Sequence, residues 1–234
     1  MTFSNRAPAT WCRWLLGAVL SFAAVAALAH GVSESDKGFL QGSNGVQILP
    51  FLYLGAKHMV TGYDHLLFLC GVIFFLYRLK DVGMYVTLFA VGHSTTLLMG
   101  VLNGWHINAY MVDAIIGLSI VYRAFDNLGG FRTVFGVQPN KKAAVLIFGF
   151  FHGLGLATKL QDFALSQDGL IPNMLAFNVG VEIGQLLALS MILIAMRYWR
   201  STASFARYAV KGNFALMTAG LLLAGFQFTG FLTK

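Results

Sequence analysis

The feature that most constrains this chain is a series of six apolar stretches, each close to the length that a helix needs to cross a bilayer. A spanning helix takes about 20 mostly apolar residues. Only 11% of the 234 residues are charged and 57% are hydrophobic, whereas a soluble domain has roughly 25% charged residues. The stretches lie at 52–77, 83–102, 108–126, 143–161, 172–197 and 213–232. The pattern predicts an all-α fold, a polytopic membrane bundle of six transmembrane helices joined by short connections.

The N-terminal segment 1–29 has the features of a secretory signal peptide. Arg6 and Arg13 form a positive n-region before a short apolar core, and Ala-Leu-Ala ends at Ala29 with the small residues that signal peptidase accepts. The alternative is an uncleaved first transmembrane helix. Cleavage after Ala29 would leave His30 at the mature N-terminus, where its amine and imidazole can chelate one metal ion. A histidine placed there by coincidence is the simpler alternative.

The basic residues predict how the bundle is oriented, because cytoplasmic loops concentrate Lys and Arg. We divide the mature chain into a periplasmic arm, 30–47, and a six-helix domain, 48–234. With the arm outside, the inner loops contain Arg78, Lys80, Arg123, Arg132, Lys141, Lys142, Arg197, Arg200, Arg207 and Lys211. The outer side contains Lys37, Lys57, Lys159 and Lys234. The bias favours a bacterial inner-membrane protein with both mature termini in the periplasm, so the net charge of +7 reflects topology and not nucleic-acid binding.

Ionisable side chains recur inside the predicted spans, where each costs about 2.5–3.5 kcal/mol to insert. They are His58, Asp64, His65, His93, Asp113, His152 and Glu182. A structural explanation exists for each one alone, such as a histidine bonded to a serine or an aspartate paired with a basic residue. Seven together, with no Lys or Arg expected at the same depth, favour a cation-binding route. Imidazole suits nickel, copper, zinc and iron, and carboxylates can complete a mixed site.

The spacing of the first group requires a particular backbone. On an unbroken helix His58 and His65 would stand about 10.5 Å apart along the axis, at 1.5 Å per residue, which one ion cannot bridge. A break near Gly62 would bring His58 back over Asp64 and His65, and irregular backbone is tolerated where it lines a polar cavity. The alternative is that Gly62 only permits close helix packing.

A second group of polar residues predicts a site nearer the membrane centre. Asn178, Glu182 and Gln185 lie at i, i+4 and i+7 and form one stripe on the fifth span. We expect Glu182 to join His93 and His152 in this site, with Asn178 and Gln185 supporting the geometry.

Two pairs of glycines offer a way to assemble that second site. Gly149 and Gly153 flank the histidine of the fourth span, and Gly180 and Gly184 flank the glutamate of the fifth. Small residues at this spacing allow close approach of membrane helices. The spacing therefore predicts that the fourth and fifth spans pack against each other.

Four motifs in order resemble those of a known family. They are His58-x-x-x-Gly62-x-Asp64-His65, Gly92-His93-Ser94, Phe151-His152-Gly153 and Phe177-Asn178-x-Gly180-x-Glu182. From about His30 to the C-terminus the chain resembles the hydrogenase/urease accessory membrane proteins of the HupE/UreJ type, most closely their second subgroup. The resemblance implies a six-helix inner-membrane protein with a cleaved signal peptide, which admits nickel for hydrogenase or urease maturation. It also implies metal contact at His58, Asp64 and His65; Met59 stands where the nickel-permease signature has Pro.

We therefore expect a permease for a divalent transition metal, with Ni²⁺ favoured and Cu²⁺, Co²⁺, Zn²⁺ or Fe²⁺ open. The ion is the substrate, and no catalytic cofactor is expected. No Gly-x-x-x-x-Gly-Lys-Ser/Thr loop for ATP is present. The expected partners are the lipid bilayer and either a metallochaperone or further copies of the chain, without nucleic acid. A non-transporting metal sensor or assembly factor is the main alternative; an intramembrane metalloenzyme or protease is less favoured, so we expect no enzyme.

Overall fold

The computed structural model describes residues 42, 44–161 and 166–233. The chain divides into two units, 1–31 and 32–234, and every described residue belongs to the second. The predicted signal peptide, His30 and most of the predicted arm lie outside the described residues. Within them the regular secondary structure is helical throughout, which confirms the all-α expectation.

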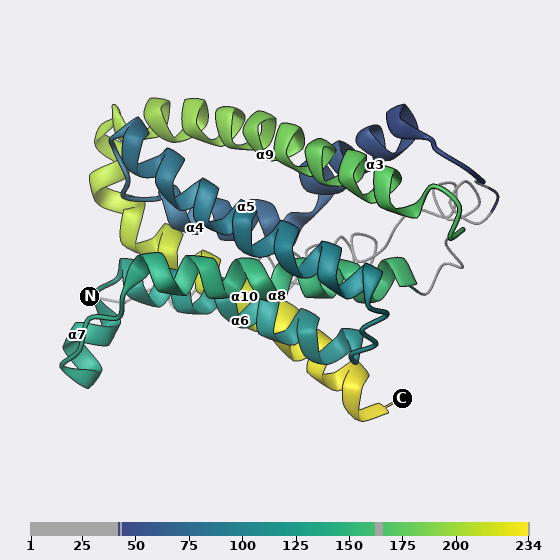
Figure 1. Cartoon of the computed structure of the whole chain (residues 1–234). Helices are drawn as coiled ribbons and strands as arrows, with labels where there is room; N and C mark the ends of the chain where they lie inside the picture. The colour runs from purple at the N-terminus through teal and green to yellow at the C-terminus, as the bar shows by residue number, and fades with distance from the viewer. Residues whose placement is uncertain (1–41, 43, 162–165, 234) are drawn as a thin grey trace, which may run out of the picture. The chain divides into compact units, whose positions relative to one another are not determined.

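Eight helices make up the described part of the chain (Figure 1). They are α3 (Ile48–Thr61), α4 (Tyr63–Ile73), α5 (Leu79–Leu102), α6 (Ala109–Asn127), α7 (Gly130–Phe135), α8 (Lys141–Gln161), α9 (Leu170–Arg200) and α10 (Ala203–Thr233). Four of them, α5, α8, α9 and α10, are long and apolar enough to cross a membrane. The structure thus supports a helical membrane protein, while the total of six spans stays a prediction.

The first predicted span is broken where the histidine spacing requires it. Gly62 has extended backbone, with φ −72° and ψ 101°, and separates α3 from α4. Its N–H donates to the carbonyl of His58 at 2.9 Å, and its own carbonyl accepts from Leu66 N at 3.1 Å. The last turn of α3 and the first turn of α4 thereby each keep a backbone hydrogen bond to Gly62, and a membrane interior requires backbone groups to be bonded in this way.

Glycines bring the helices together in three pairs, α5 with α8, α3 with α9, and α6 with α10. A Cβ on Gly149 would lie 2.5 Å from the Phe89 carbonyl oxygen in α5, and one on Gly184 would lie 2.5 Å from the Ala56 carbonyl oxygen in α3. The prediction that the fourth and fifth spans pack through these glycines was therefore wrong. Helical spacing identifies a small-residue face, but it does not identify the helix that packs against it.

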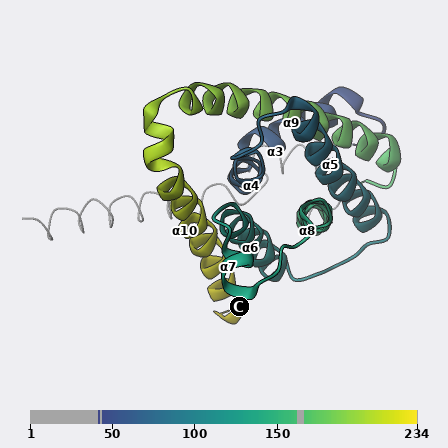
Figure 2. The same ribbon diagram turned by 90° about the vertical axis from the view of Figure 1, so that its left-hand side faces the viewer.

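The short helix α4 links these pairs. It contacts α6, α9 and α10 as well as α3, and the view in Figure 2 shows α4 among the longer helices. The residues of α4 that face its neighbours include His65, Phe68 and Leu69, all at most 2% exposed. The histidine of this helix is therefore held in the core of the described bundle.

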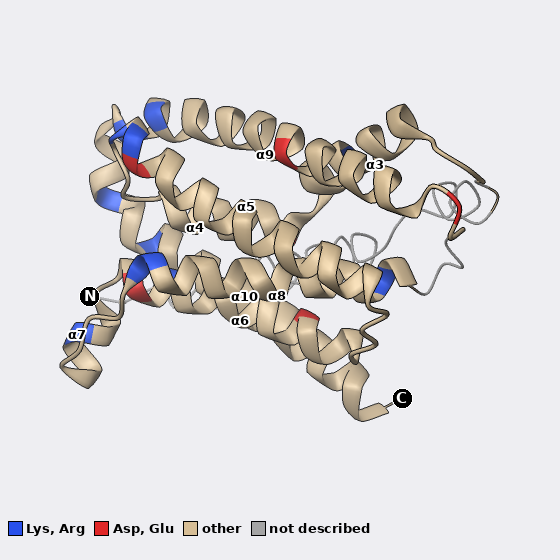
Figure 3. Ribbon diagram, viewed as in Figure 1, with Lys and Arg blue, Asp and Glu red and all other residues tan. Residues whose placement is uncertain are grey.

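Basic side chains gather at the end of the bundle where α7 lies, where α5 and α8 begin and α9 ends (Figure 3). Arg200 donates to the carbonyls of Phe74 at 2.8 Å and Leu76 at 2.9 Å, just beyond α4. Arg123 pairs with Asp126 within α6. Lys159 lies away from them, in the last turn of α8. The uneven distribution of Lys and Arg from which the orientation was predicted is thus also present between the two ends of the folded bundle.

Candidate metal centre

Three histidines from three helices meet in the core. His58 comes from α3, His65 from α4 and His93 from α5, and one ring nitrogen of each lies within 4.8 Å of the others. His65 is 2% exposed and His93 is fully buried. The break at Gly62 makes this possible, because it allows His58 to approach His65 in spite of their seven-residue separation. The predicted approach of these two histidines is confirmed.

A fourth histidine, His152 of α8, adjoins His65. Its ring centroid lies 4.8 Å from that of His65, and its side chain is 1% exposed. His65 is central to the group, with centroids 5.2 Å from His58 and 5.6 Å from His93. We call these four residues the histidine cluster.

The histidine cluster has several ring nitrogens with no hydrogen-bond partner among the described residues. They are Nε2 of His58, Nε2 of His65, Nδ1 and Nε2 of His93, and Nδ1 of His152, all buried. Buried polar atoms are nearly always hydrogen-bonded, and an orphaned one costs about 1–3 kcal/mol. Unpartnered nitrogens on four neighbouring imidazoles therefore indicate a site built for a ligand that accepts nitrogen lone pairs.

Asp64 orients His65. Its Oδ1 accepts from Nδ1 of His65 at 2.8 Å and from the backbone N–H of His65 at 2.8 Å. From this pairing we infer that Nδ1 holds the proton, which leaves the Nε2 lone pair free within the cluster. The arrangement is the carboxylate–histidine pairing that fixes ring orientation and raises ligand basicity at metal sites. The sequence predicted metal contact at Asp64, whereas the structure gives it this orienting position.

Gly62 leaves the room that this pairing needs. A Cβ at that position would lie 3.0 Å from Nδ1 of His65 and 3.1 Å from Oδ1 of Asp64. The same residue therefore both interrupts the helix and clears space beside the hydrogen bond. The helix break predicted at Gly62 is therefore correct, and the alternative that Gly62 only permits close helix packing is wrong, because the atoms nearest to it belong to His58, Asp64 and His65 of its own segment.

Ser119 of α6 orients His152 in a similar way. The Ser119 hydroxyl donates to the carbonyl of Ile116 at 2.6 Å, and its oxygen lies 3.3 Å from Nε2 of His152. Because the hydroxyl proton is already used, we infer that Nε2–H of His152 donates to Ser119, leaving Nδ1 unprotonated. Sequence reasoning missed Ser119, since one serine in an apolar span gives no signal of its partner.

Glycines allow α5, which carries His93, to pack closely on α8, which carries His152. Gly153 lies directly against the backbone carbonyl of His93, and a Cβ there would clash with that oxygen. The rings of Phe68 and Phe89 lie 5.2 and 5.0 Å from His152. These apolar rings surround the cluster and lower the local dielectric, which strengthens any bond to a cation.

Asp113 does not join the cluster. Its Oδ2 lies 2.8 Å from Nζ of Lys159, and the Asp113 side chain is 5% exposed. The expectation that no basic residue would lie at this depth was wrong, because the flexible Lys159 side chain reaches from α8 to α6. The ion pair stabilises the contact between these helices and assigns Asp113 a structural position.

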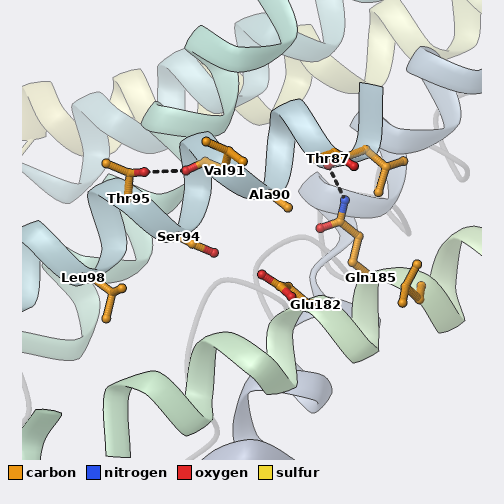
Figure 4. Close-up of a pocket in the computed structure, with 10 residues that line it drawn as sticks. Thr87, Ala90, Val91, Ser94, Thr95, Leu98, Glu182 and Gln185 are labelled. Carbon is orange, nitrogen blue, oxygen red and sulfur yellow. Dashed lines mark hydrogen bonds between the residues drawn. The ribbon is translucent and has the colours of Figure 1, made fainter. Parts of the chain in front are cut away.

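The polar stripe on α9 also lies apart from the cluster. Glu182 is exposed and borders a hollow of about 440 Å³ between α5 and α9 (Figure 4). Gln185 is buried and donates to the carbonyl of Val86 at 3.2 Å, while Asn178 donates to the Met174 carbonyl at 3.1 Å. The structure thus brings His93 to the group that contains His65, and the expected second site with Glu182 is not formed.

The family model described as HupE / UreJ protein matches residues 34–234. No match was found among curated proteins or among solved structures. The match spans every helix that supplies the histidine cluster, and it supports a membrane protein with a metal transport or accessory role. The chain belongs to the HupE/UreJ family.

Proposed function

We propose that this protein moves a divalent transition-metal ion across the bacterial inner membrane through the histidine cluster, with Ni²⁺ the favoured substrate. The observation that supports the proposal most directly is the meeting of three imidazole nitrogens within 4.8 Å of one another in a buried site. Imidazole is a good ligand for nickel and also for copper, zinc and iron. The ion would then supply the maturation of a metalloenzyme, directly or through a metallochaperone.

The route begins at the end of the bundle away from the basic residues. α3 and the N-terminal half of α9 lie toward that end (Figure 1), and His58 of α3 is the only member of the cluster that is not fully buried. In this proposal the end near α7 is cytoplasmic and both mature termini are periplasmic. An ion would meet His58 first, then His65, and then His93 and His152. His30 would collect the ion outside.

The driving force in this proposal is the membrane potential. An inside-negative potential favours entry of a dication by about 4.6 kcal/mol per 100 mV, twice the value for one charge. Neutral imidazoles bind the ion without cancelling its charge, so that the potential continues to act on it. The proposal includes no ATP hydrolysis and no other catalysis by this chain.

Uptake by sealed proteoliposomes tests the proposal. We expect radiolabelled Ni²⁺ to enter wild-type vesicles under an imposed inside-negative potential, and entry to be lost in His65→Ala. The matched control is His106→Ala, because His106 is exposed in the connection between α5 and α6, where its Nδ1 donates to the carbonyl of Gly104. Equal uptake by wild type and His65→Ala would refute the proposed route. Competition with Cu²⁺, Co²⁺, Zn²⁺ and Fe²⁺ then identifies the ion.

The depth of the site also favours a second candidate, a sensor or assembly factor that retains the metal. His93 is fully buried and His152 is 1% exposed, as in a site that holds an ion. Stoichiometric Ni²⁺ bound to the purified protein, with no entry into vesicles, would favour this candidate over transport.

A further inference from the structure

The hollow between α5 and α9 gathers oxygen atoms around one carboxylate. Glu182 points into it from α9, and Ser94 points toward Glu182 from α5 (Figure 4). Gln185, one turn after Glu182 on α9, lines the same hollow. Among the described residues Glu182 has neither a hydrogen bond nor an ion pair.

Two neighbouring oxygens are also without partners. Oε1 of Gln185 and Oγ of Ser94 are buried and have no hydrogen bond, although the Gln185 side chain is only 1% exposed and its nitrogen is fixed on Val86 O. The amide is thereby oriented so that its oxygen, not its nitrogen, is left for a ligand. An oriented acceptor beside a carboxylate is suited to a cation.

The charge of the hollow limits which cation it suits. The other side chains that line it are apolar or are threonines, among them Thr87 and Thr95, and neither α5 nor α9 adds another charge to its walls. A lone carboxylate at membrane depth is unfavourable unless its charge is neutralised. One positive charge achieves this, whereas a divalent ion would leave the hollow with a net charge of +1.

The oxygen-only lining separates this hollow from the histidine cluster. Carboxylate, amide carbonyl and hydroxyl oxygens are hard ligands, and transition metals such as nickel are better served by imidazole. The volume, about 440 Å³, also holds several waters at roughly 30 Å³ each. A small cation can therefore keep part of its hydration shell beside Glu182.

We propose that the Glu182 hollow binds one monovalent cation, Na⁺, at a site separate from the histidine cluster. Ser94 follows His93 directly on α5, so the two sites lie on adjoining faces of one helix. Occupancy of the hollow is thereby placed to respond to occupancy of the cluster. The use of the bound cation as a coupling ion for metal movement rests on the proposed function, whereas the binding of the cation does not.

Binding is measured on the purified full-length chain without transition metal. For Na⁺ the probe is ²²Na⁺, and we expect saturable binding that is lost in Glu182→Gln and kept in the matched control Asp81→Asn. Saturable ²²Na⁺ binding that depends on Glu182 supports the proposal. Absence of saturable ²²Na⁺ binding, equal binding in Glu182→Gln, or binding of Mn²⁺ in place of Na⁺ at Glu182 would overturn it.

Coupling is measured in the proteoliposomes. We expect an imposed Na⁺ gradient to change the rate of Ni²⁺ entry in wild type and to have no effect in Glu182→Gln. Ni²⁺ binding to the histidine cluster should persist in that variant, which shows that it is folded. If wild type takes up no Ni²⁺ but still binds the monovalent cation at Glu182, the proposed transport fails and this inference survives. Entry that responds equally to the gradient in both proteins would overturn the coupling.

Discussion

Replacing Asp64 by Asn tests whether this carboxylate orients His65 or contacts the metal itself. Oδ1 of Asp64 accepts two hydrogen bonds from His65, each 2.8 Å long, from the ring Nδ1 and from the backbone N–H. An asparagine oxygen can still accept these bonds, but it does so without the negative charge that raises the basicity of the ring. Loss of such a supporting carboxylate lowers metal affinity by about 10–100-fold, and a tenfold change is about 1.4 kcal/mol.

Equilibrium dialysis of Ni²⁺ with the detergent-solubilised protein measures this change. We expect Asp64→Asn to bind about 10–100-fold more weakly than wild type, with unchanged stoichiometry, and His65→Ala to lose the site. Asp81→Asn, in the first turn of α5, is the control that removes one carboxylate elsewhere. Wild-type affinity in Asp64→Asn would refute the orienting role. A loss as large as that of His65→Ala would instead make Asp64 a direct ligand.

Three further substitutions test the surroundings of the cluster. Ser119→Ala removes the acceptor of the His152 N–H, so Ni²⁺ affinity should fall by about 10-fold or more. The ¹⁵N NMR spectrum of the histidines should then show a mixture of tautomers, and an unchanged spectrum would contradict the tautomer assigned to His152. Gly153→Ala should lower the free energy of thermal unfolding by about 1–3 kcal/mol, because it disturbs the α5–α8 contact. The control Gly83→Ala should not lower it, because a Cβ at that position would have no other atom within 4 Å. Breaking a fully buried ion pair lowers the free energy of unfolding by about 3–5 kcal/mol. Asp113→Asn should lower it by less, since the Lys159 side chain is 22% exposed. Adding Lys159→Met should recover part of that loss in stability, whereas additive losses would show that the two residues are not coupled.

The break in the first span could be predicted because a distance forced it. His58 and His65 share a face of a straight helix but lie too far apart to share an ion, and Gly62 is a residue between them that can end one helix and begin another. The structure places the break at that residue. Arguments from spacing within one segment depend only on helix geometry, and so they succeeded.

The partners of each helix could not be predicted in the same way. Gly153 marks a face where another helix comes close, but only the folded chain shows that this helix is α5, with the His93 carbonyl in contact. The pairing of Asp113 with Lys159 depends on a long side chain that crosses between helices. Ser119 and His152 are brought together by the packing of α6 on α8. Contacts between segments depend on the tertiary arrangement, which periodicity along one segment does not determine.

The central claim is that the imidazoles of the histidine cluster hold the metal. X-ray absorption spectroscopy of the Ni²⁺-loaded protein, recorded for wild type and for His93→Ala, tests it most directly. We expect the wild-type spectrum to show the multiple-scattering signature of several imidazole ligands, at least the three whose nitrogens lie within 4.8 Å of one another, and the variant to lose one of them. A first shell of oxygen atoms alone, or an identical spectrum in His93→Ala, would contradict the account.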